Sequence, residues 1–396
     1  MEELIYYNQV LLDNVSSTFK RFLYDTIDWE QKMIAISGAR GVGKTTLMLQ
    51  KQKELGGIAT TSLYITLEHP YFYGHTLFEL ADTWYKMGGK LLFIDEVHKY
   101  INWSKELKVI YDLFPDLHII LSASSALEIY RGEADLSRRL INYKLPGLSF
   151  REYLQIKGIN TLPKIPLHTL IKEHVSISKG ITGFAILHEF QQYLKNGYYP
   201  FMVNLKESDY TTRLNQVINT VMDIDLANAE GYTPATAFKL KKLLAVLAES
   251  VPFQPNVAEL ARKLLLSRDT IYQYLNYLER ASMLLALHAQ GKGMSPMQKP
   301  EKLYLENTNL SYALKRNPDK GNLRETFLYN QIVHSGLEVS APKTGDFYTE
   351  GKIIEVGGKT KRKKQLSSLS DAIIASDDII MGAGHKVPLW MFGLLY

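Results

Sequence analysis

The chain has 396 residues, more than one hydrophobic core usually contains, so we expect two or three domains. Apolar residues make up 46% and charged residues 22%, a balance typical of globular proteins that excludes a largely disordered chain. The formal net charge of +5 permits nucleic-acid binding without requiring it. Because there is no cysteine, disulfide frameworks, thiolate metal sites and cysteine nucleophiles are excluded.

The beginning of the chain, Met1 to Ile5, is acidic and lacks the basic and apolar regions of a signal peptide. No uninterrupted apolar run approaches the ~18 residues that a membrane-spanning helix needs. We therefore expect a cytoplasmic protein that has no membrane partner.

Residues 1–30 have roughly helical apolar spacing, and five short apolar segments follow, separated by helical patterns. These candidate strands are residues 33–36, 62–67, 91–94, 118–122 and 142–145. Strands that alternate with helices predict the α/β class, with a doubly wound, mostly parallel sheet.

Beyond the predicted sheet, helical patterns dominate as far as the Gly- and Pro-rich turn after residue 290. The character then changes to mixed α/β. We predict three domains, which comprise residues 1–150, 151–300 and 301–396.

Residues 38–45 fit the pattern G-x-x-x-x-G-K-[ST], directly after one predicted strand and before a helix. In such a loop, glycines let main-chain N–H groups converge on phosphate oxygens at the positive end of the helix. Lys44 is expected to reach the β- and γ-phosphates, and the Thr45 hydroxyl to bind Mg²⁺. The residues expected to contact the nucleotide are Gly38, Ala39, Arg40, Gly41, Val42, Gly43, Lys44, Thr45, Thr46 and Asp95.

Asp95 and Glu96 follow the apolar run of residues 91–94. At the end of a buried strand, Asp95 can hold the magnesium ion and Glu96 can polarise a water for attack on the γ-phosphate. Two acids that simply end a strand are the alternative, which the phosphate-binding pattern upstream disfavours. One strand is predicted between the two motifs, which is typical of the additional-strand branch of P-loop NTPases.

Ser122 and Ser124 end the next predicted strand, where this branch carries a polar group that senses the γ-phosphate. The alternative is that these serines cap a helix. Further along, Arg138 and Arg139 precede the fifth strand. An arginine there can stabilise transition-state charge in its own subunit or in a neighbour, or it can belong to the solvated surface.

The chain resembles a bacterial and archaeal family of AAA+-type ATPases that carry a C-terminal domain of unknown function. The stretches that carry the resemblance are Ile36 to Thr45, Leu92 to His98, Leu121 to Ser125, Leu145 to Tyr153, Tyr193 to Pro200 and Val387 to Tyr396. The resemblance implies ATP rather than GTP and places the family's arginine at Arg139. Family members usually have Gly-Arg where this chain has Arg138-Arg139.

Residues 256–305 have the outline of a winged helix, which the family resemblance also implies. Asn256 with Glu259 forms a capping box, Ser267 can cap a second helix over residues 268–280, and two apolar segments then flank a turn. If this region binds double-stranded DNA, the candidate contacts are Arg268, Gln273 and Asn276. A structural or protein-binding role is the alternative, since the second helix carries few cations.

For residues 302–396 the resemblance implies a restriction-endonuclease-like, PD-(D/E)xK fold. Sites of this type bind a divalent metal through clustered acids and use a lysine to position water. The matching residues are Glu325, Asp346 and Glu355. The lysine expected at position 357 is a glycine, so Lys359 is the candidate in its place. A structural domain that has lost nuclease activity is the alternative.

We therefore predict a P-loop NTPase of the AAA+ type that binds ATP and Mg²⁺ and hydrolyses ATP, and possible partners are DNA or another protein. The catalytic candidates are Lys44, Glu96, Ser122, Ser124 and Arg139. Two alternatives stay open: a nucleotide-regulated DNA-binding switch with little turnover, and a metal-dependent nuclease gated by ATP. The sequence leaves the oligomeric state open.

Overall fold

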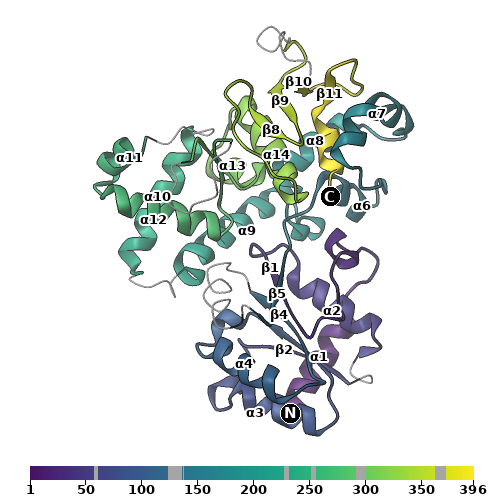
Figure 1. Ribbon diagram of the computed structural model, residues 1–396, viewed down its shortest axis with the longest axis vertical. Coiled ribbons are helices and arrows are strands. Elements are labelled where there is room, and N and C mark those ends of the chain that lie inside the picture. The colour runs from purple at the N-terminus through teal and green to yellow at the C-terminus, as the bar shows by residue number, and fades with distance from the viewer. Residues whose placement is uncertain are drawn as a thin grey trace. The chain divides into compact units, whose positions relative to one another are not determined.

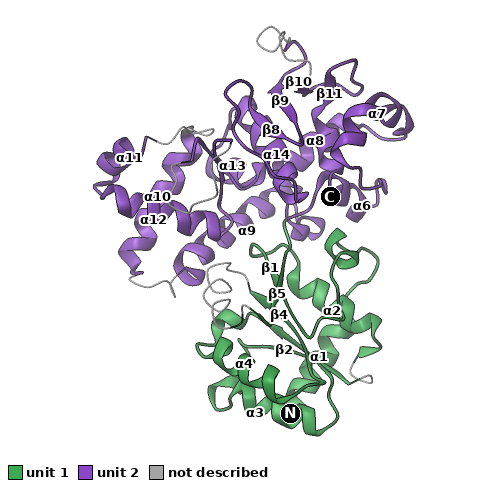
Figure 2. Cartoon of the chain, viewed as in Figure 1, with its two compact units in different colours: residues 1–146 green, residues 147–396 purple. Residues whose placement is uncertain are grey.

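The computed structural model describes residues 1–57, 61–123, 136, 138–226, 232–250, 256–290, 300–361 and 372–396. The chain forms two compact units, residues 1–146 (unit 1) and residues 147–396 (unit 2), which Figure 2 shows in different colours. In the sequence we expected three domains, and their boundaries stay a prediction.

Unit 1 is built on a five-stranded sheet with the order β2-β3-β4-β1-β5, in which every neighbouring pair is parallel. The predicted α/β class and all five predicted strands are confirmed. Strand β4 lies between β1 and β3, as expected for the additional-strand branch. The elements, most of whose helices and strands are labelled in Figure 1, are α1 (Glu2–Asn14), η1 (Phe22–Asp25), β1 (Met33–Ser37), α2 (Lys44–Glu54), β2 (Ser62–Thr66), η3 (Pro70–Tyr73), α3 (Leu77–Lys86), β3 (Leu91–Asp95), η4 (Val97–Lys99), α4 (Trp103–Leu113), β4 (His118–Ala123) and β5 (Ile141–Lys144).

The inner strands of this sheet are buried on both faces, which explains why they appear in the sequence as continuous apolar runs. All five residues of β1 are buried, whereas β5 lies at an edge and is largely exposed. Alternate residues of β1 to β4, such as Met33 and Ile94, pack against Leu80 and Trp84 of α3 and against Ile110 of α4. Helix α2 packs against β2 and β4 and brings the phosphate-binding loop to the sheet.

The helical pattern of the first thirty residues extends in the structure only to Asn14. Val15 is extended, and the following residues run along α2. The Gln50 side-chain amide donates hydrogen bonds to the carbonyls of Ser16 (2.7 Å) and Phe19 (2.8 Å). Long-range partners for the main chain thus replace the helical hydrogen bonds that the local pattern favours.

Unit 2 combines helices with a two-stranded sheet, β6-β7, and a four-stranded sheet of order β11-β10-β9-β8. In the larger sheet β8 and β9 are antiparallel, and β9, β10 and β11 are parallel. The elements are α6 (Phe150–Ile156), α7 (Leu167–Gly180), α8 (Ile186–Asn196), η5 (Pro200–Asn204), α9 (Glu207–Thr220), η6 (Val221–Asp225), α10 (Pro234–Ser250), α11 (Val257–Leu264), α12 (Arg268–Arg280), β6 (Leu284–Leu287), β7 (Lys302–Leu305), α13 (Thr308–Leu314), α14 (Lys320–His334), β8 (Phe347–Thr349), β9 (Lys352–Gly357), β10 (Ala372–Ser376), β11 (Lys386–Pro388) and η8 (Leu389–Leu394).

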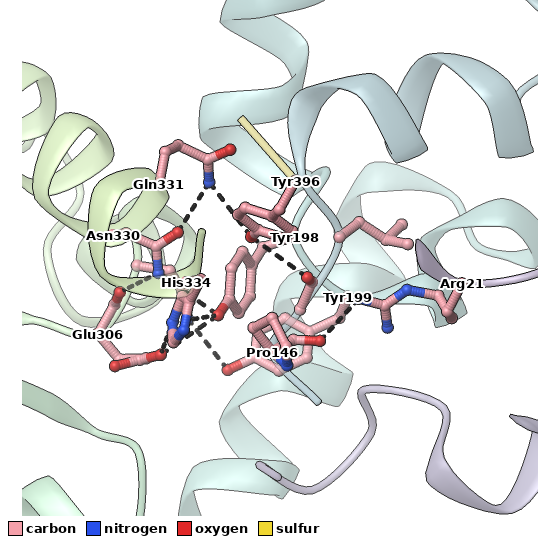
Figure 3. Close-up of polar contacts among 12 residues, drawn as sticks. Arg21, Pro146, Tyr198, Tyr199, Glu306, Asn330, Gln331, His334 and Tyr396 are labelled. Atoms are coloured by element: carbon pink, nitrogen blue, oxygen red, sulfur yellow. Dashed lines mark hydrogen bonds and ion pairs between the residues drawn. The ribbon is translucent and has the colours of Figure 1, made fainter. Parts of the chain in front are cut away.

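A buried polar network lies in the core of unit 2 (Figure 3). His334 of α14 contacts Glu306 with 2.6 Å between Nε2 and Oε1, and both side chains are only 3% exposed. The Tyr198 hydroxyl lies 3.3 Å from the same carboxylate oxygen, and the Asn330 amide donates to the Glu306 carbonyl at 2.6 Å. These bonds join segments that are far apart in the sequence, so this network helps to specify the fold of unit 2.

Among the described helices, none is both long enough and apolar enough to cross a lipid bilayer.

Candidate functional site

The phosphate-binding loop connects β1 to α2 at the carboxyl edge of the parallel sheet. Gly41 and Gly43 have φ angles of 85° and 97°, in the left-handed region that glycine adopts at little cost. Gly43 precedes the first turn of α2, and no side chain caps that end of the helix. The positive end of α2 therefore faces the loop, which is the arrangement that favours a bound phosphate.

Lys44 lies within this loop and is buried. Its ammonium group donates hydrogen bonds to the carbonyls of Gly38 (2.9 Å) and Ala39 (3.2 Å). The loop thus folds around the lysine, which keeps the cation at the position where phosphate oxygens are expected.

Asp95, the last residue of β3, accepts hydrogen bonds on both carboxylate oxygens. Oδ2 accepts from the hydroxyls of Thr45 (2.5 Å) and Tyr64 (2.7 Å). Oδ1 accepts from the Ser122 hydroxyl and from the main-chain N–H of Glu96 (3.1 Å). The predicted pair Thr45 and Asp95 is therefore brought together from two elements, and it offers the hard oxygen ligands that Mg²⁺ prefers.

Glu96 follows in a left-handed conformation, with φ of 53°, which is rare for a residue with a side chain. Its carboxylate oxygen Oε2 lies 3.3 Å from Nδ1 of the buried His98. Burial raises the pKa of the Glu96 carboxyl group, Lys44 opposes the shift, and Asp95 adds to it. A carboxylate whose pKa is raised is a stronger base than usual, and strained conformations of this type are frequent at functional sites.

Ser122 lies in β4 next to Asp95, and its hydroxyl is buried. Besides donating to Asp95, it accepts a hydrogen bond from the Glu96 main-chain N–H at 3.3 Å. Ser122 thus holds the two acids in place, and its predicted contact with a nucleotide stays a prediction. Ser124, the second candidate, lies outside the described residues.

Arg139 lies shortly before β5 and pairs with Asp112 of α4. Its Nε and Nη2 atoms donate to the two carboxylate oxygens at 2.9 Å each. This bidentate pair lowers the pKa of Asp112 chiefly through the hydrogen bond. The predicted role of Arg139 in catalysis stays a prediction.

Two residues of the site were missed in the sequence. Tyr64 of β2 donates to Asp95, and Arg21 donates to the carbonyls of Val42 (2.6 Å) and Pro146 (2.7 Å), the second bond being drawn in Figure 3. Arg21 thus joins the phosphate-binding loop to the end of unit 1. Neither belongs to a spaced motif, and Arg21 stands beside a second basic residue, Lys20, so the sequence gives no signal that singles it out.

In unit 2, Glu325 of α14 and Asp346 lie together, as predicted, but a lysine from β7 joins them. The Lys302 ammonium lies 3.2 Å from Glu325 and 3.3 Å from Asp346, and the Tyr304 hydroxyl donates to Glu325 at 2.8 Å. Burial raises the pKa of Glu325, and Asp346 adds to this shift.

The other two members of the predicted nuclease site are Glu355 and Lys359. Glu355 pairs with Lys361 at 2.6 Å, and Lys359 is exposed. Within the described part of the chain, no three Asp, Glu or His side chains are grouped so that they could hold a metal ion. The acids of the predicted nuclease site are therefore only partly assembled.

Helices α10, α11 and α12 precede an antiparallel pair of strands, β6 and β7. The Asn256 side chain accepts from the Glu259 N–H (3.2 Å), which is the N-cap half of the predicted capping box, and Ser267 accepts from the Thr270 N–H (3.0 Å), as predicted. On α12, Arg268 and Gln273 are exposed. The helices and hairpin of the predicted outline are confirmed, whereas a winged-helix function stays a prediction.

Comparison with known proteins agrees with the architecture of unit 1. Residues 30–154 match the family described as an AAA domain. This match and the parallel sheet agree with a P-loop NTPase fold for unit 1. Residues 187–321 match a domain of unknown function, DUF8612.

Three known proteins are similar to large parts of the chain. It is 24% identical to the uncharacterized protein MJ1637 of Methanocaldococcus jannaschii in an alignment that covers 96% of this chain and 88% of that protein. The Walker-type ATPase PABY2304 of Pyrococcus abyssi is 12% identical, with 77% of this chain and 99% of that one covered and a TM-score of 0.42. AMPPCP-bound DnaA from Aquifex aeolicus is 15% identical, with coverages of 70% and 88% and a TM-score of 0.31.

Proposed function

We propose that unit 1 binds ATP together with Mg²⁺ and hydrolyses it to ADP and phosphate. The observation that carries this proposal is the pairing of Thr45 with Asp95 at the phosphate-binding loop, beside the buried base Glu96. Lys44 binds the β- and γ-phosphates, and Thr45 and Asp95 hold the metal. A bound Mg²⁺ ion neutralises charge on the phosphate oxygens.

Glu96 acts as the base that orients and deprotonates the attacking water. Its raised pKa and the neighbouring Asp95 favour proton uptake, while Lys44 and His98 limit the shift. The left-handed main chain at Glu96, fixed by the N–H bonds to Asp95 and Ser122, turns this side chain away from the strand direction.

The test is phosphate release from Mg-ATP by wild type, Glu96→Gln and Lys44→Ala. Loss of a positioned base lowers rates by ~10²–10⁴, so Glu96→Gln should release almost no phosphate while it still binds a fluorescent ATP analogue. Lys44→Ala should lose binding as well. Glu30→Gln, a change at an exposed carboxylate of unit 1, should behave as wild type. Tight ATP binding without release by wild type would identify a nucleotide-regulated switch instead.

We further propose that nucleotide state is coupled to DNA or to a protein partner through α11, α12 and the β6-β7 hairpin. The support is the helix–helix–hairpin order with Arg268 and Gln273 exposed on α12. Duplex DNA should then stimulate phosphate release, and Arg268→Glu should remove that stimulation but leave the basal rate unchanged. A basal rate that DNA leaves unaffected at low salt would direct the search to a protein partner.

Nuclease activity is the weaker alternative, because Glu355 pairs with Lys361 and no three acids or histidines among the described residues are grouped to hold a metal ion. Cleavage of DNA that Glu355→Ala abolishes and Lys44→Ala preserves would establish it.

A further inference from the structure

Tyr64 occupies the middle of β2, where it is 2% exposed and lies opposite Phe93 of β3. Its hydroxyl donates to Oδ2 of Asp95 at 2.7 Å. Tyr64 therefore holds a hydrogen bond to a carboxylate of the candidate nucleotide site.

The Thr45 and Tyr64 hydroxyls, which both donate to Oδ2 of Asp95, differ in their other expected roles. Thr45 stands at the start of α2, and its hydroxyl is the group expected to bind Mg²⁺. Tyr64 stands on a central position of a buried strand, and its ring is enclosed. If the Thr45 hydroxyl bound a metal instead, Tyr64 would be the donor left on Oδ2, while Ser122 would still hold Oδ1.

Tyr64 is itself held by the N-terminal helix α1. Its main-chain N–H donates to Oδ1 of Asn8 at 3.0 Å. The side-chain amides of Asn8 and Gln52 exchange two hydrogen bonds, of 2.9 Å and 2.8 Å, and both side chains are fully buried. A chain of hydrogen bonds thus runs from α1 through β2 to Asp95, entirely within unit 1.

We propose that Tyr64 is a positioning residue that orients Asp95 for Mg²⁺ and that α1 supports it through Asn8. The proposal rests on the proposed function, because it assigns a role to Asp95 in metal binding. In the alternative, Tyr64 fills the core and its hydroxyl merely finds a partner. The two differ in one respect: only a positioning residue alters the dependence on Mg²⁺ when the hydroxyl is removed and the ring is kept.

The experiment is a Mg²⁺ titration of fluorescent ATP-analogue binding to wild type and Tyr64→Phe, read without turnover. We expect half-saturation in Mg²⁺ to rise about three- to tenfold in Tyr64→Phe, as for loss of one hydrogen bond of typical strength. Affinity for the nucleotide without Mg²⁺ should change less than about twofold. Phosphate release at saturating ATP should show the same shift in Mg²⁺ dependence.

Tyr100→Phe is the matched control, because the Tyr100 hydroxyl donates to Glu106 at 2.7 Å and so also loses a bond to a carboxylate. It should leave the Mg²⁺ titration unchanged. Asn8→Ala should shift the titration in the same direction as Tyr64→Phe, and an unchanged titration would remove α1 from the proposal. A wild-type Mg²⁺ dependence in Tyr64→Phe overturns the inference. Absence of phosphate release from wild type would overturn only the proposed hydrolysis, since the binding titration does not depend on it.

Discussion

Gly38, the first glycine of the phosphate-binding loop, packs directly against the main-chain carbonyl of Leu145. A β-carbon built on Gly38 would lie 2.2 Å from that oxygen, far inside van der Waals contact. Leu145 is itself fixed, because its N–H donates to the Ser37 carbonyl at 2.7 Å. The loop can therefore reach its position over the sheet only because residue 38 has no side chain.

Gly38→Ala should accordingly displace the loop from β5. Overpacking of this kind costs about 1–3 kcal/mol, and we expect affinity for Mg-ATP to fall by roughly 10- to 100-fold. Binding of a fluorescent ATP analogue measures the effect. Gly74→Ala is the matched control, because a β-carbon there meets no atom within 4 Å. Equal affinities for both variants would contradict the argument.

Arg21→Met should destabilise unit 1 and weaken ATP binding together. Arg21 is 5% exposed and its guanidinium donates to the carbonyls of Val42 and Pro146, so its loss leaves these acceptors without the two bonds. Because these hydrogen bonds are charge-assisted, we expect the free energy of unfolding to fall by about 2–4 kcal/mol. Chemical denaturation measures it.

The neighbouring variant Lys20→Met provides the control for this change. Lys20 pairs with Glu54 at the surface, where both side chains are more than one-third exposed. Exposed ion pairs contribute at most about 1 kcal/mol, so Lys20→Met should stay close to wild type. An Arg21 variant as stable as the Lys20 variant would show that the two carbonyls find other donors.

The strands and the phosphate-binding loop could be predicted because their signals are local. Buried parallel strands are continuous apolar runs, and residues 38–45 carry their spacing within one segment. Tyr64, by contrast, reaches Asp95 only because β2 lies next to β3 in the sheet. The sequence of neither strand indicates which strand it pairs with. Arg21 bonds to main-chain carbonyls, which every residue has, so no side-chain pattern could indicate its partners.

The predicted nuclease site shows the same limit. The sequence predicts its lysine near Glu355 along the strand, with Lys359 as the candidate. The lysine that contacts Glu325 and Asp346 in the structure is Lys302, which comes from a different strand before α14. Residues that come into contact through tertiary packing are separated by segments of variable length, so their spacing in the sequence does not predict the contact.

Glu96→Gln should stabilise the protein in a pH-dependent manner. Burial raises the pKa of Glu96 above its ordinary value of 4.5, so folding favours the protonated carboxyl group. That favourable contribution is complete below the unfolded pKa and is lost as the pH rises through the folded pKa. At about pH 8 the ionised carboxylate therefore costs stability, which the neutral glutamine removes.

Thermal unfolding between about pH 4 and pH 8 tests whether the stabilisation by Glu96→Gln increases with pH. The Glu96→Gln midpoint should exceed that of wild type at the upper end, and the difference should shrink toward the lower end. Glu30→Gln controls for the loss of one negative charge from the surface. A difference that grows as the pH falls would mean that His98 and Lys44 stabilise the ionised form more than burial opposes it.

His334→Leu should open the core of unit 2, because it leaves the Glu306 carboxylate buried without its closest partner. His334 and Glu306 are 2.6 Å apart and almost fully buried, and the remaining Tyr198 hydroxyl lies at 3.3 Å. Removal of one member of a buried pair costs about 3–5 kcal/mol. Hydrogen exchange in peptides that cover α14 should accelerate by roughly 10²–10³, while peptides that cover α2 in unit 1 serve as the internal reference.

Two further variants separate the loss of this pair from a general effect of mutation. His188→Leu, a change at an exposed histidine of unit 2, should leave exchange in α14 unchanged. The double variant Glu306→Leu with His334→Leu removes both polar groups and should recover most of the protection, since the main cost of the single change is the unpaired buried carboxylate. If the double variant exchanges faster than His334→Leu, the fold of unit 2 depends on the remaining bonds to Tyr198 and Asn330 more than on the pair itself.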